Sequence, residues 1–319
     1  MVFNHRFKDR RGGYDAVKVY SYELRRLRVD GPLLYSLRSK GEIWYDNHGN
    51  FKPMMKDGPI DPKILDAGKR FPKTKAPLSL LHLFMREQLL HVRLAEEMLA
   101  DASVYFKAFL QHREDSLAMF FTVDGFSGRV HTPIVNLKHD LRMHLTLKGE
   151  AVASLDVKQM QPTILAEILK KNIGPNPFSD TVARGDDVYL LLLKQNKELH
   201  SRGEAKKFLF QLIFGLPMDD IGRMFEGNTH WVEWINRYKS RPEPRNPHGR
   251  DTHTNLAWLL QHSEVHVMTI IWNKLYERGI PFLTIHDDIL CRRSDVDTVH
   301  GVMVEILKEH FPKFVIKVS

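Results

Sequence analysis

The segment from residue 281 to residue 293 constrains the fold more than any other part of the sequence. Its two apolar halves are separated by two adjacent acids, Asp287 and Asp288. Apolar strand halves around a polar tip are typical of a β-hairpin. Two neighbouring carboxylates between such strands repel each other and lose hydration, so they require a compensating cation. The sequence therefore predicts a hairpin with a cation-binding tip.

A third acid stands near the end of another predicted strand. Residues 151–157 read Ala-Val-Ala-Ser-Leu-Asp-Val, which places Asp156 one position before the end. Taken alone, such an aspartate is ordinarily a turn or helix-capping residue. Together, however, three carboxylates can hold two Mg²⁺ ions about 3.5–4 Å apart and so stabilise both oxygens of an in-line phosphoryl displacement. The acids indicate metal-dependent phosphoryl transfer, which fits a nuclease and a polymerase equally.

The other hydrophobic patterns mix helical and strand spacing without a strict strand–helix–strand order. A strand pair is predicted at 120–123 and 128–132, and a last strand at 314–318. Helical spacing covers residues 79–112, 162–171, 187–197, 203–214, 254–277 and 296–311. This mixture favours an α+β fold over a doubly wound sheet.

Composition narrows the class of protein. The chain has 319 residues, 43% of them hydrophobic, with 47 Lys and Arg against 39 Asp and Glu. One cysteine, Cys291, excludes a disulfide framework, and no apolar run approaches the ~20 residues that span a bilayer. We therefore expect a soluble, intracellular, cytoplasmic protein with no membrane partner. Basic residues gather at 1–40 and 237–250, which indicates either a phosphate-facing surface or a solvated basic face.

Four residues of the predicted helix near 203–214 share one stripe. Arg202, Lys206, Phe210 and Phe214 recur at every fourth position. Two cations followed by two rings can meet a triphosphate at one end and a sugar or base at the other. The alternative is that both phenylalanines are core residues, as a helical aromatic stripe usually indicates. Charged groups that continue the same stripe do not fit a core, because they are rarely buried unpaired.

These segments and their order resemble one known family. Residues 156–161 resemble motif A of the family A DNA polymerases, the group that includes bacterial DNA polymerase I, and residues 285–288 resemble motif C. Residues 202–215 match motif B at the spacing Arg-x3-Lys-x3-Phe-x3-Tyr/Phe-Gly. Shorter similarities lie at 128–132, 136–137, Phe178, 185–189, Gln261 and Ser263. The resemblance covers about residues 118–319.

The resemblance implies a role for each matched residue. Asp156, the backbone carbonyl of Val157 and Asp287 would bind two Mg²⁺ ions, with Mn²⁺ as a substitute, and Asp288 would stand in for the usual glutamate of motif C. Arg202 and Lys206 would grip the phosphates of the incoming nucleotide. Phe210 would pack on the sugar of this nucleotide, and Phe214 would abut the nascent base pair. Tyr189 would also contact the phosphates. Arg129, Asn136, Gln261 and His286 would contact the duplex or the primer end.

One departure from the family concerns the sugar. Gln161 occupies the place of a glutamate that blocks a ribose 2′-OH and bonds a tyrosine, and Phe214 replaces that tyrosine. Gln161 is still bulky enough to act as a steric gate. We therefore expect dNTP use with imperfect exclusion of rNTPs.

The resemblance implies a right-hand polymerase fold with an antiparallel-sheet palm, helical fingers and a reduced thumb. We expect a basic N-terminal region at 1–78, a helical thumb-like segment at 79–117, and a palm at 118–319 with fingers inserted at about 164–253. The length leaves no room for proofreading or 5′-nuclease domains, and a reduced thumb grips the duplex product less, so we expect a polymerase without proofreading and of low processivity. The expected partners are primer-template DNA and dNTPs; any accessory processivity protein is unidentified.

Three other functions stay open on the sequence. A single-subunit RNA polymerase or primase could use the same palm, and rNTP use with primer-free initiation would distinguish it. A metal-dependent nuclease needs the acids but has no need of the cations in the helical stripe. A non-catalytic nucleic-acid-binding protein would not need the acids and Lys206 together.

Overall fold

The computed structural model describes residues 78–218, 221–227, 229–243, 245–246 and 252–319, together with three short strands nearer the N-terminus. These strands, β1 (Ile43–Tyr45), β2 (Phe51–Met55) and β3 (Gly58–Pro59), pair antiparallel in the order β1-β2-β3. The basic cluster at 1–40 and the end of the second one, 247–250, lie outside the described residues.

Six antiparallel strands form the central sheet, in the order β4-β7-β8-β10-β9, with β11 also paired to β8. Lys148 and Gly149, both at positive φ, make the tight turn that joins β7 to β8. The strands are β4 (Val92–Leu94), β7 (Leu145–Leu147), β8 (Glu150–Val157), β9 (Phe282–Ile285), β10 (Asp288–Arg292) and β11 (Ile316–Val318). A separate small hairpin pairs β5 (Thr122–Val123) with β6 (Val130–His131). Strand β8, which holds Asp156, thus has partners on both sides.

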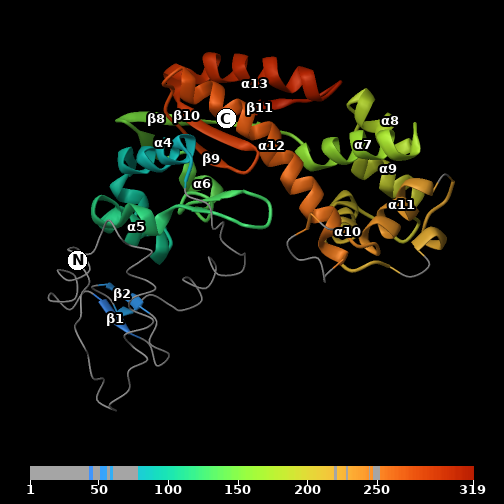
Figure 1. The fold of residues 1–319 in the computed structure, drawn as a ribbon, viewed down its shortest axis with the longest axis horizontal. Helices are drawn as coiled ribbons and strands as arrows, with labels where there is room; N and C mark the ends of the chain where they lie inside the picture. The colour runs from blue at the N-terminus through green and yellow to red at the C-terminus, as the bar shows by residue number, and fades with distance from the viewer. Residues whose placement is uncertain are drawn as a thin grey trace, which may run out of the picture.

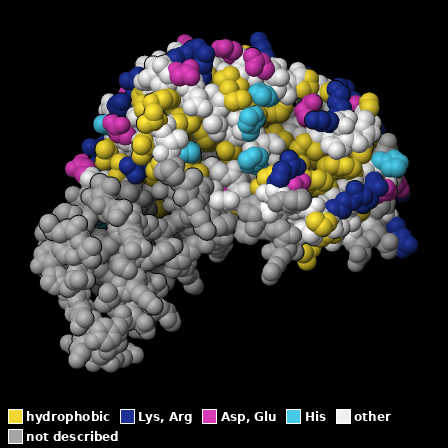
Figure 2. All heavy atoms as spheres, in the orientation of Figure 1, with side chains coloured by type: hydrophobic (Ala, Val, Ile, Leu, Met, Phe, Trp, Pro, Cys, Tyr) yellow, Lys and Arg dark blue, Asp and Glu magenta, His cyan; other side chains and the backbone are white. Residues whose placement is uncertain are grey.

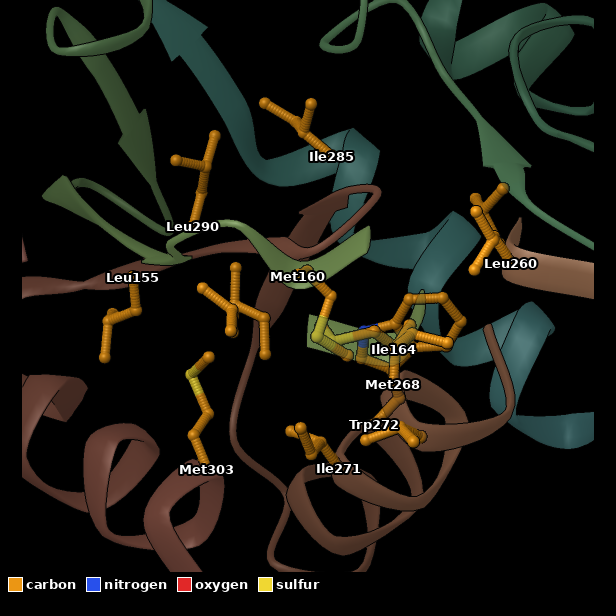
Figure 3. Packing of buried hydrophobic residues seen from close by; sticks show 14 of the residues in the cluster. Leu155, Met160, Ile164, Leu260, Met268, Ile271, Trp272, Ile285, Leu290 and Met303 are labelled. Carbon is orange, nitrogen blue, oxygen red and sulfur yellow. The ribbon is translucent and has the colours of Figure 1, made fainter. Parts of the chain in front are cut away.

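Helices cover one face of this sheet. Because successive side chains of a strand point to opposite faces, Leu155 of β8 points to the helix-covered side, where it lies near Met303 (Figure 3). Ile271 and Trp272 of a long helix complete this buried layer. Burying each such side chain contributes roughly 1.5–3 kcal/mol. The helices around the sheet are α4 (Leu80–Gln88), α5 (Val104–Ser116), α6 (His139–Arg142), α12 (Asn255–Glu277) and α13 (Val296–His310).

A second lobe is built from helices alone (Figure 1). Phe178 and Trp231 are fully buried in it, with ring centroids 5.0 Å apart. Local signals set its helix ends: Asn176 and Ser179 form a capping box ahead of one helix, and Ser201 caps another. The helices are α7 (Met160–Ile173), α8 (Pro177–Arg184), α9 (Val188–Gln195), α10 (Arg202–Phe214) and α11 (His230–Lys239).

The helix α12 joins the two lobes. It is 23 residues long and packs against α13 and α4 in the sheet lobe and against α7, α10 and α11 in the helical lobe. Figure 1 shows it crossing from one lobe to the other. A side chain on α12 can therefore reach residues of both lobes.

Most of the elements predicted from the sequence are confirmed. The hairpin at 281–293 is β9 and β10, the strand at 151–157 is β8, and the helix at 296–311 is α13. The mixed helix-and-sheet architecture with an antiparallel sheet confirms the α+β class. None of the helices among the described residues has the length and apolar character needed to span a membrane.

The continuous helix expected at 79–112 is wrong. The helix α4 ends at Gln88, β4 follows at Val92–Leu94, and α5 begins only at Val104. Val92 and Leu94 are buried while Arg93 between them is exposed, because β4 pairs with β7 at the edge of the sheet. This alternation is a strand pattern inside a segment whose overall apolar spacing fits a helix. The proposed domain boundaries at 78 and 117 stay predictions.

Candidate active site

The sheet register brings the predicted acids to one corner. Asp156 of β8 lies directly opposite Asp288 of β10, so both side chains stand on the same face of the sheet. Asp287 lies at the tip of the β9–β10 hairpin, and its carbonyl oxygen accepts a hydrogen bond of 3.3 Å from the N–H of Val157. The end of β8 and the hairpin tip are thus tied together. We call Asp156, Asp287 and Asp288 the acid corner.

The acid corner is electrostatically costly. Burial raises the pKa of Asp287 to about 8, and the negative charges of Glu264 and Asp156 add to the rise. Burial also raises the pKa values of Asp156 and Asp288. For Asp288, a 2.7 Å hydrogen bond from the Ser154 hydroxyl works against this rise. All three carboxyls are therefore harder to ionise than an exposed aspartate. A bound cation would lower this cost, because its positive charge favours the ionised form of each carboxyl.

The oxygen donors fit Mg²⁺ in kind, because carboxylates and a backbone carbonyl are hard ligands. In the present side-chain arrangement, however, no three acidic, histidine or cysteine side chains of the described residues are grouped closely enough to hold a metal ion. The Asp288 carboxylate accepts from Ser154 instead. Metal binding at the acid corner therefore remains a proposal and would require side-chain rotation.

Cations surround the acid corner. Lys317 of β11 lies opposite Asp156 on the other side of β8, and its charge and that of Lys158 oppose the rise in the Asp156 pKa. Arg142 acts in the same way on Asp288. The Arg142 guanidinium also donates hydrogen bonds to two backbone carbonyls, at 2.9 and 3.3 Å. These side chains keep the local charge nearer to balance than the acids alone would.

Backbone strain marks both sides of the acid corner. His286, just before Asp287, has φ +60°, and Gln159, at the start of α7, has φ +55°. The left-handed region costs a non-glycine residue on the order of 1–3 kcal/mol, and such strain gathers at functional sites. Burial lowers the pKa of His286 to about 3, helped by the charge of Arg129, so the ring stays neutral. Its Nδ1 has no hydrogen-bond partner within the described part of the chain.

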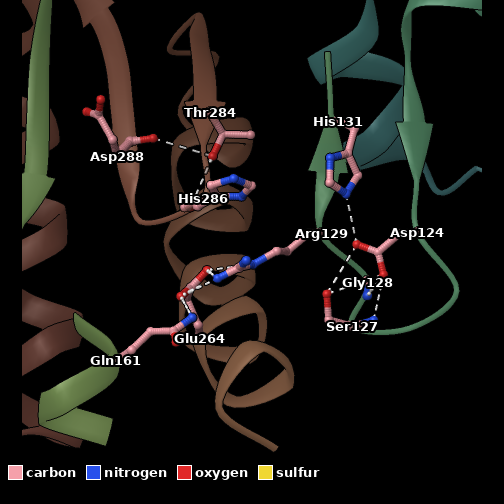
Figure 4. Close-up of polar contacts among 10 residues, drawn as sticks. All are labelled: Asp124, Ser127, Gly128, Arg129, His131, Gln161, Glu264, Thr284, His286 and Asp288. Carbon is pink, nitrogen blue, oxygen red and sulfur yellow. Dashed lines mark hydrogen bonds and ion pairs between the residues drawn. The ribbon is translucent and has the colours of Figure 1, made fainter. Parts of the chain in front are cut away.

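A buried glutamate links three elements beside this corner (Figure 4). Glu264 of α12 is only 1% exposed and accepts three hydrogen bonds from Arg129, one through Nε at 3.0 Å and two through Nη2 at 2.6 and 2.8 Å. It also accepts a hydrogen bond of 2.9 Å from the Nε2 of Gln161, in the first turn of α7. We call Arg129, Glu264 and Gln161 the glutamate network.

A tight turn aims Arg129 at α12. The buried Asp124 carboxylate accepts from the backbone N–H groups of Phe126 and Ser127, at 2.9 and 2.6 Å, and lies 3.0 Å from His131 Nε2. These bonds outweigh burial and lower the pKa of Asp124. Gly128 follows at φ +82°, a conformation that glycine adopts without strain. The β5–β6 connection is therefore rigid where it presents Arg129.

The stripe predicted on α10 lies on a face of the helix that points away from its buried side. Phe210 is 46% exposed, and the buried residues of α10 lie on a different face, at Ala205, Phe208, Leu209, Leu212 and Ile213. Figure 2 shows basic and hydrophobic side chains next to one another over the helical lobe. Phe210 is therefore not a core residue, whereas Phe214 is partly buried and packs against the core, as the alternative expected.

Side chains along this stripe contact one another. The Arg202 guanidinium lies 4.8 Å from the ring centroid of Tyr189 and pairs with Asp187 at 2.6 Å. Lys206 Nζ lies 5.9 Å from the Phe210 centroid, and the Phe210 and Phe214 rings are 5.7 Å apart. We call Tyr189, Arg202, Lys206, Phe210 and Phe214 the α10 stripe.

The inner end of the α10 stripe reaches the turn that carries Arg129. Phe214 packs against a small apolar cluster of Phe126, Ala257 and Trp258. Phe126 belongs to the β5–β6 turn, and the other two belong to α12. The β5–β6 turn and α12 therefore each carry one residue that packs near Phe214 and one residue of the glutamate network.

No protein-family model matches the chain, and no curated protein matches it. One solved structure that matches is the POL domain of Pol1 from M. smegmatis in complex with DNA primer-template and dNTP, with a TM-score of 0.46 and 13% sequence identity. The match covers 95% of this chain but only 65% of that one. A likeness of this degree does not establish a shared function.

Two residues assigned from the sequence lie outside these groups. Asn136 is exposed in the loop between β6 and α6, and Gln261 is half-buried on α12, one turn before Glu264. Their expected contacts with a duplex stay predictions.

Glu264 is the main residue that the sequence analysis missed. It was hidden inside a buried helical stripe that otherwise reads Leu260, Met268, Ile271 and Leu275. An acid at such a position is a usable signal, since buried carboxylates are rare unless paired. Finding its partners required the fold, because Arg129 is 135 residues away in the sequence.

Proposed function

We propose that the protein is a template-directed DNA polymerase that adds dNTPs to a primer 3′-OH. One observation carries this proposal: Phe214 of the α10 stripe packs against Phe126 and Trp258, and these belong to the same turn and the same helix that carry Arg129 and Glu264 beside the acid corner. A nuclease would need the acid corner but would have no use for a neighbouring stripe of cations and rings. A nucleic-acid-binding protein would have no use for three neighbouring acids whose pKa values are raised by desolvation.

In this proposal the acid corner holds the metals. Asp156, the carbonyl oxygen of Val157 and Asp287 bind two Mg²⁺ ions, for which Mn²⁺ can substitute, and Asp288 supports them. When bound, these ions supply charge neutralisation at the reacting phosphate and favour the ionised 3′-oxygen. His286, held neutral by burial at the hairpin tip, contacts the primer end.

The α10 stripe then binds the incoming nucleotide. Arg202 and Lys206 contact the phosphates, and Arg202 exchanges its pairing with Asp187 for them. Tyr189 holds the Arg202 guanidinium against its ring. The nucleotide sugar packs on Phe210, and Phe214 abuts the new base pair. Because this chemistry depends on position and charge, ordering the triphosphate beside the acids supplies much of the rate enhancement.

The remaining assignments concern DNA. Arg129, Asn136 and Gln261 contact the primer-template duplex, Gln161 limits the space beside the sugar, and residues 164–253 act as the fingers. We further propose that the enzyme does not proofread and dissociates after short products. Long products from one binding event on a trapped template would contradict this last point.

Primer extension tests the proposal. The native protein, Asp287→Asn and the exposed-acid control Asp101→Asn are each given a primed DNA template, Mg²⁺, and either dNTPs or rNTPs. We expect template-ordered extension with dNTPs, lost on the order of 100-fold or more in Asp287→Asn because metal charge stabilisation is worth several kcal/mol. The control variant should extend like the native protein.

A specific observation also favours a second candidate, an RNA polymerase or primase. Phe214 stands where the resembled family has a tyrosine, and it has no hydroxyl that could bond Gln161. Extension with rNTPs alone, or initiation without a primer, would support this candidate. Shortening of the primer would instead indicate a nuclease, and DNA binding without any extension would contradict both polymerase assignments.

A further inference from the structure

Glu264 is a buried carboxylate without a role in the assignments above. At 1% exposure it has lost its hydration, and an ionised carboxylate is retained in such a place only where strong partners compensate it. Its partners are Arg129 and Gln161, which come from the β5–β6 turn and from α7. Glu264 therefore acts on two residues from different elements at once.

The chemistry of a carboxylate decides how Gln161 is oriented. An ionised carboxylate only accepts hydrogen bonds, whereas a glutamine amide has a donating end and an accepting end. Glu264 also accepts from Arg129, so its oxygens face donors on both sides. Gln161 must turn its Nε2 toward Glu264, and its Oε1 is left as a buried oxygen with no partner among the described residues.

The position of the glutamate network in the chain gives the orientation of Gln161 its importance. Gln161 is the second residue of α7, four residues after Val157, where the chain leaves β8 at the acid corner. Arg129 follows the turn on which Phe126 packs with Phe214. Gln161 is thus close along the chain to the end of β8 at the acid corner, and Arg129 is close along the chain to Phe126, which packs with Phe214.

We propose that Glu264 is a positioning residue for sugar selection: it fixes Gln161 in one rotamer and one amide orientation beside the nucleotide sugar, and it holds Arg129 against α12. This inference rests on the proposed function, since only a nucleotide site has a sugar to select. Without Glu264, Gln161 turns freely and its bulk excludes a 2′-OH less well.

The test compares substitutions that change the polarity of the network. In Glu264→Gln the remaining oxygen still accepts from Arg129, but the NH₂ that replaces Oε2 faces donors of both Arg129 and Gln161, so Gln161 must flip or move away. The reciprocal pair Gln161→Glu with Glu264→Gln restores one donor and one acceptor in reversed positions. Glu277→Gln, at the exposed end of the same helix, is the matched control. Thermal melting establishes that each variant folds.

The readout is kcat/KM for a dNTP and for the matching rNTP on one primer-template. We expect the dNTP preference to fall about tenfold in Glu264→Gln, the size of effect that one hydrogen bond of about 1.4 kcal/mol supports, mostly through better rNTP use. The reciprocal pair should recover the preference, and Glu277→Gln should keep it. If Glu264→Gln does not fold, Gln161→Leu tests the same bond and should lower the preference similarly.

A change of the same factor for dNTP and rNTP would show a merely structural role and overturn the inference, as would an unchanged preference. To separate this from failure of the proposed function, nucleotide binding is measured on a dideoxy-terminated primer-template, where no turnover is needed. Sugar-selective binding that Glu264→Gln leaves intact overturns the inference alone. A native protein that neither extends a primer nor binds a nucleotide overturns both.

Discussion

At the scale of single residues, neighbours decide how each acid of the acid corner behaves. Asp287 is half-buried beside the charges of Glu264 and Asp156, and desolvation together with these charges raises its pKa. Asp156 has Lys317 and Lys158 nearby, whose charges limit the rise. The sequence predicted that adjacent acids would need a cation. It could not predict which lysine and arginine side chains share that task, because Lys317 reaches Asp156 only through the pairing of β11 with β8.

The raised pKa values predict how the metal-free protein responds to pH. A carboxyl whose pKa is about 8 in the folded state and about 4 in the unfolded chain contributes stability that is fully present below pH 4 and is lost as the pH rises through 8. With EDTA present, the native protein should therefore lose unfolding free energy between about pH 4 and pH 8 by a few kcal/mol relative to Asp287→Asn. Urea unfolding at several pH values measures this difference. Parallel pH profiles for the two proteins would contradict it.

Magnesium should reverse this loss. Ligand binding stabilises the folded state by mass action, and metal binding to carboxylates strengthens as they lose their protons. Millimolar Mg²⁺ should raise the Tm of the native protein more at pH 8 than at pH 6, and should leave Asp287→Asn nearly unchanged. Equal shifts in both proteins would indicate nonspecific salt effects instead of binding at the acid corner.

At the scale of elements, a buried lysine secures the end of α10. Lys239 of α11 is fully buried, and its Nζ donates a hydrogen bond of 2.7 Å to the carbonyl of Leu212 in the last turn of α10. The last carbonyls of a helix lack partners within it, and a cation there also complements the helix dipole. Burial lowers the pKa of Lys239 to about 8. This contact holds the end of the helix where Phe214 lies.

Removing that lysine should weaken the helical lobe. Lys239→Met keeps the apolar stem but leaves the Leu212 carbonyl without its donor, so we expect a loss of about 1–3 kcal/mol of unfolding free energy. Lys170→Met, at the exposed end of α7, is the matched control and should change stability by less than about 0.5 kcal/mol. Denaturant unfolding compares the two. A Lys239→Met protein as stable as the control would show that the contact does not matter.

Alanine substitution of two neighbouring residues of α10 should affect different properties, activity in one case and stability in the other. Phe210 is 46% exposed and Leu209 is fully buried. Phe210→Ala should barely change stability but lower kcat/KM for nucleotide addition about tenfold or more. Leu209→Ala should cost about 2–5 kcal/mol of stability through the cavity that it leaves. Unfolding curves and single-nucleotide addition measure both. Full activity in Phe210→Ala would contradict the role of the α10 stripe.

The elements also explain where sequence reasoning succeeded and where it failed. The α10 stripe was visible because four matched residues lie within one helix, where spacing alone sets their common face. The hairpin was visible because both its strands and its tip are contiguous. The strand at Val92–Leu94, which interrupts the expected helix, and the role of Glu264 could not be predicted from the sequence. Both depend on partners far away in the sequence: β7 pairs with this strand, and Arg129 pairs with Glu264.

At the scale of the whole molecule, the long helix α12 connects the two lobes, because it packs against helices of both. It contributes Trp258 to the contact with Phe214 and Glu264 to the contact with Gln161 and Arg129. The acid corner belongs to the sheet lobe, and the α10 stripe belongs to the helical lobe. We propose that the two lobes act on one nucleotide that is chosen by a template.

Single-nucleotide addition on four primed DNA templates that differ only at the templating base tests this claim most directly. Each dNTP is supplied separately with Mg²⁺, and the extended primer is resolved at single-nucleotide length. We expect addition of the complementary dNTP on each template, with little product in Lys206→Ala or Asp287→Asn. Addition of the same nucleotide on all four templates, or primer shortening without addition, would contradict it.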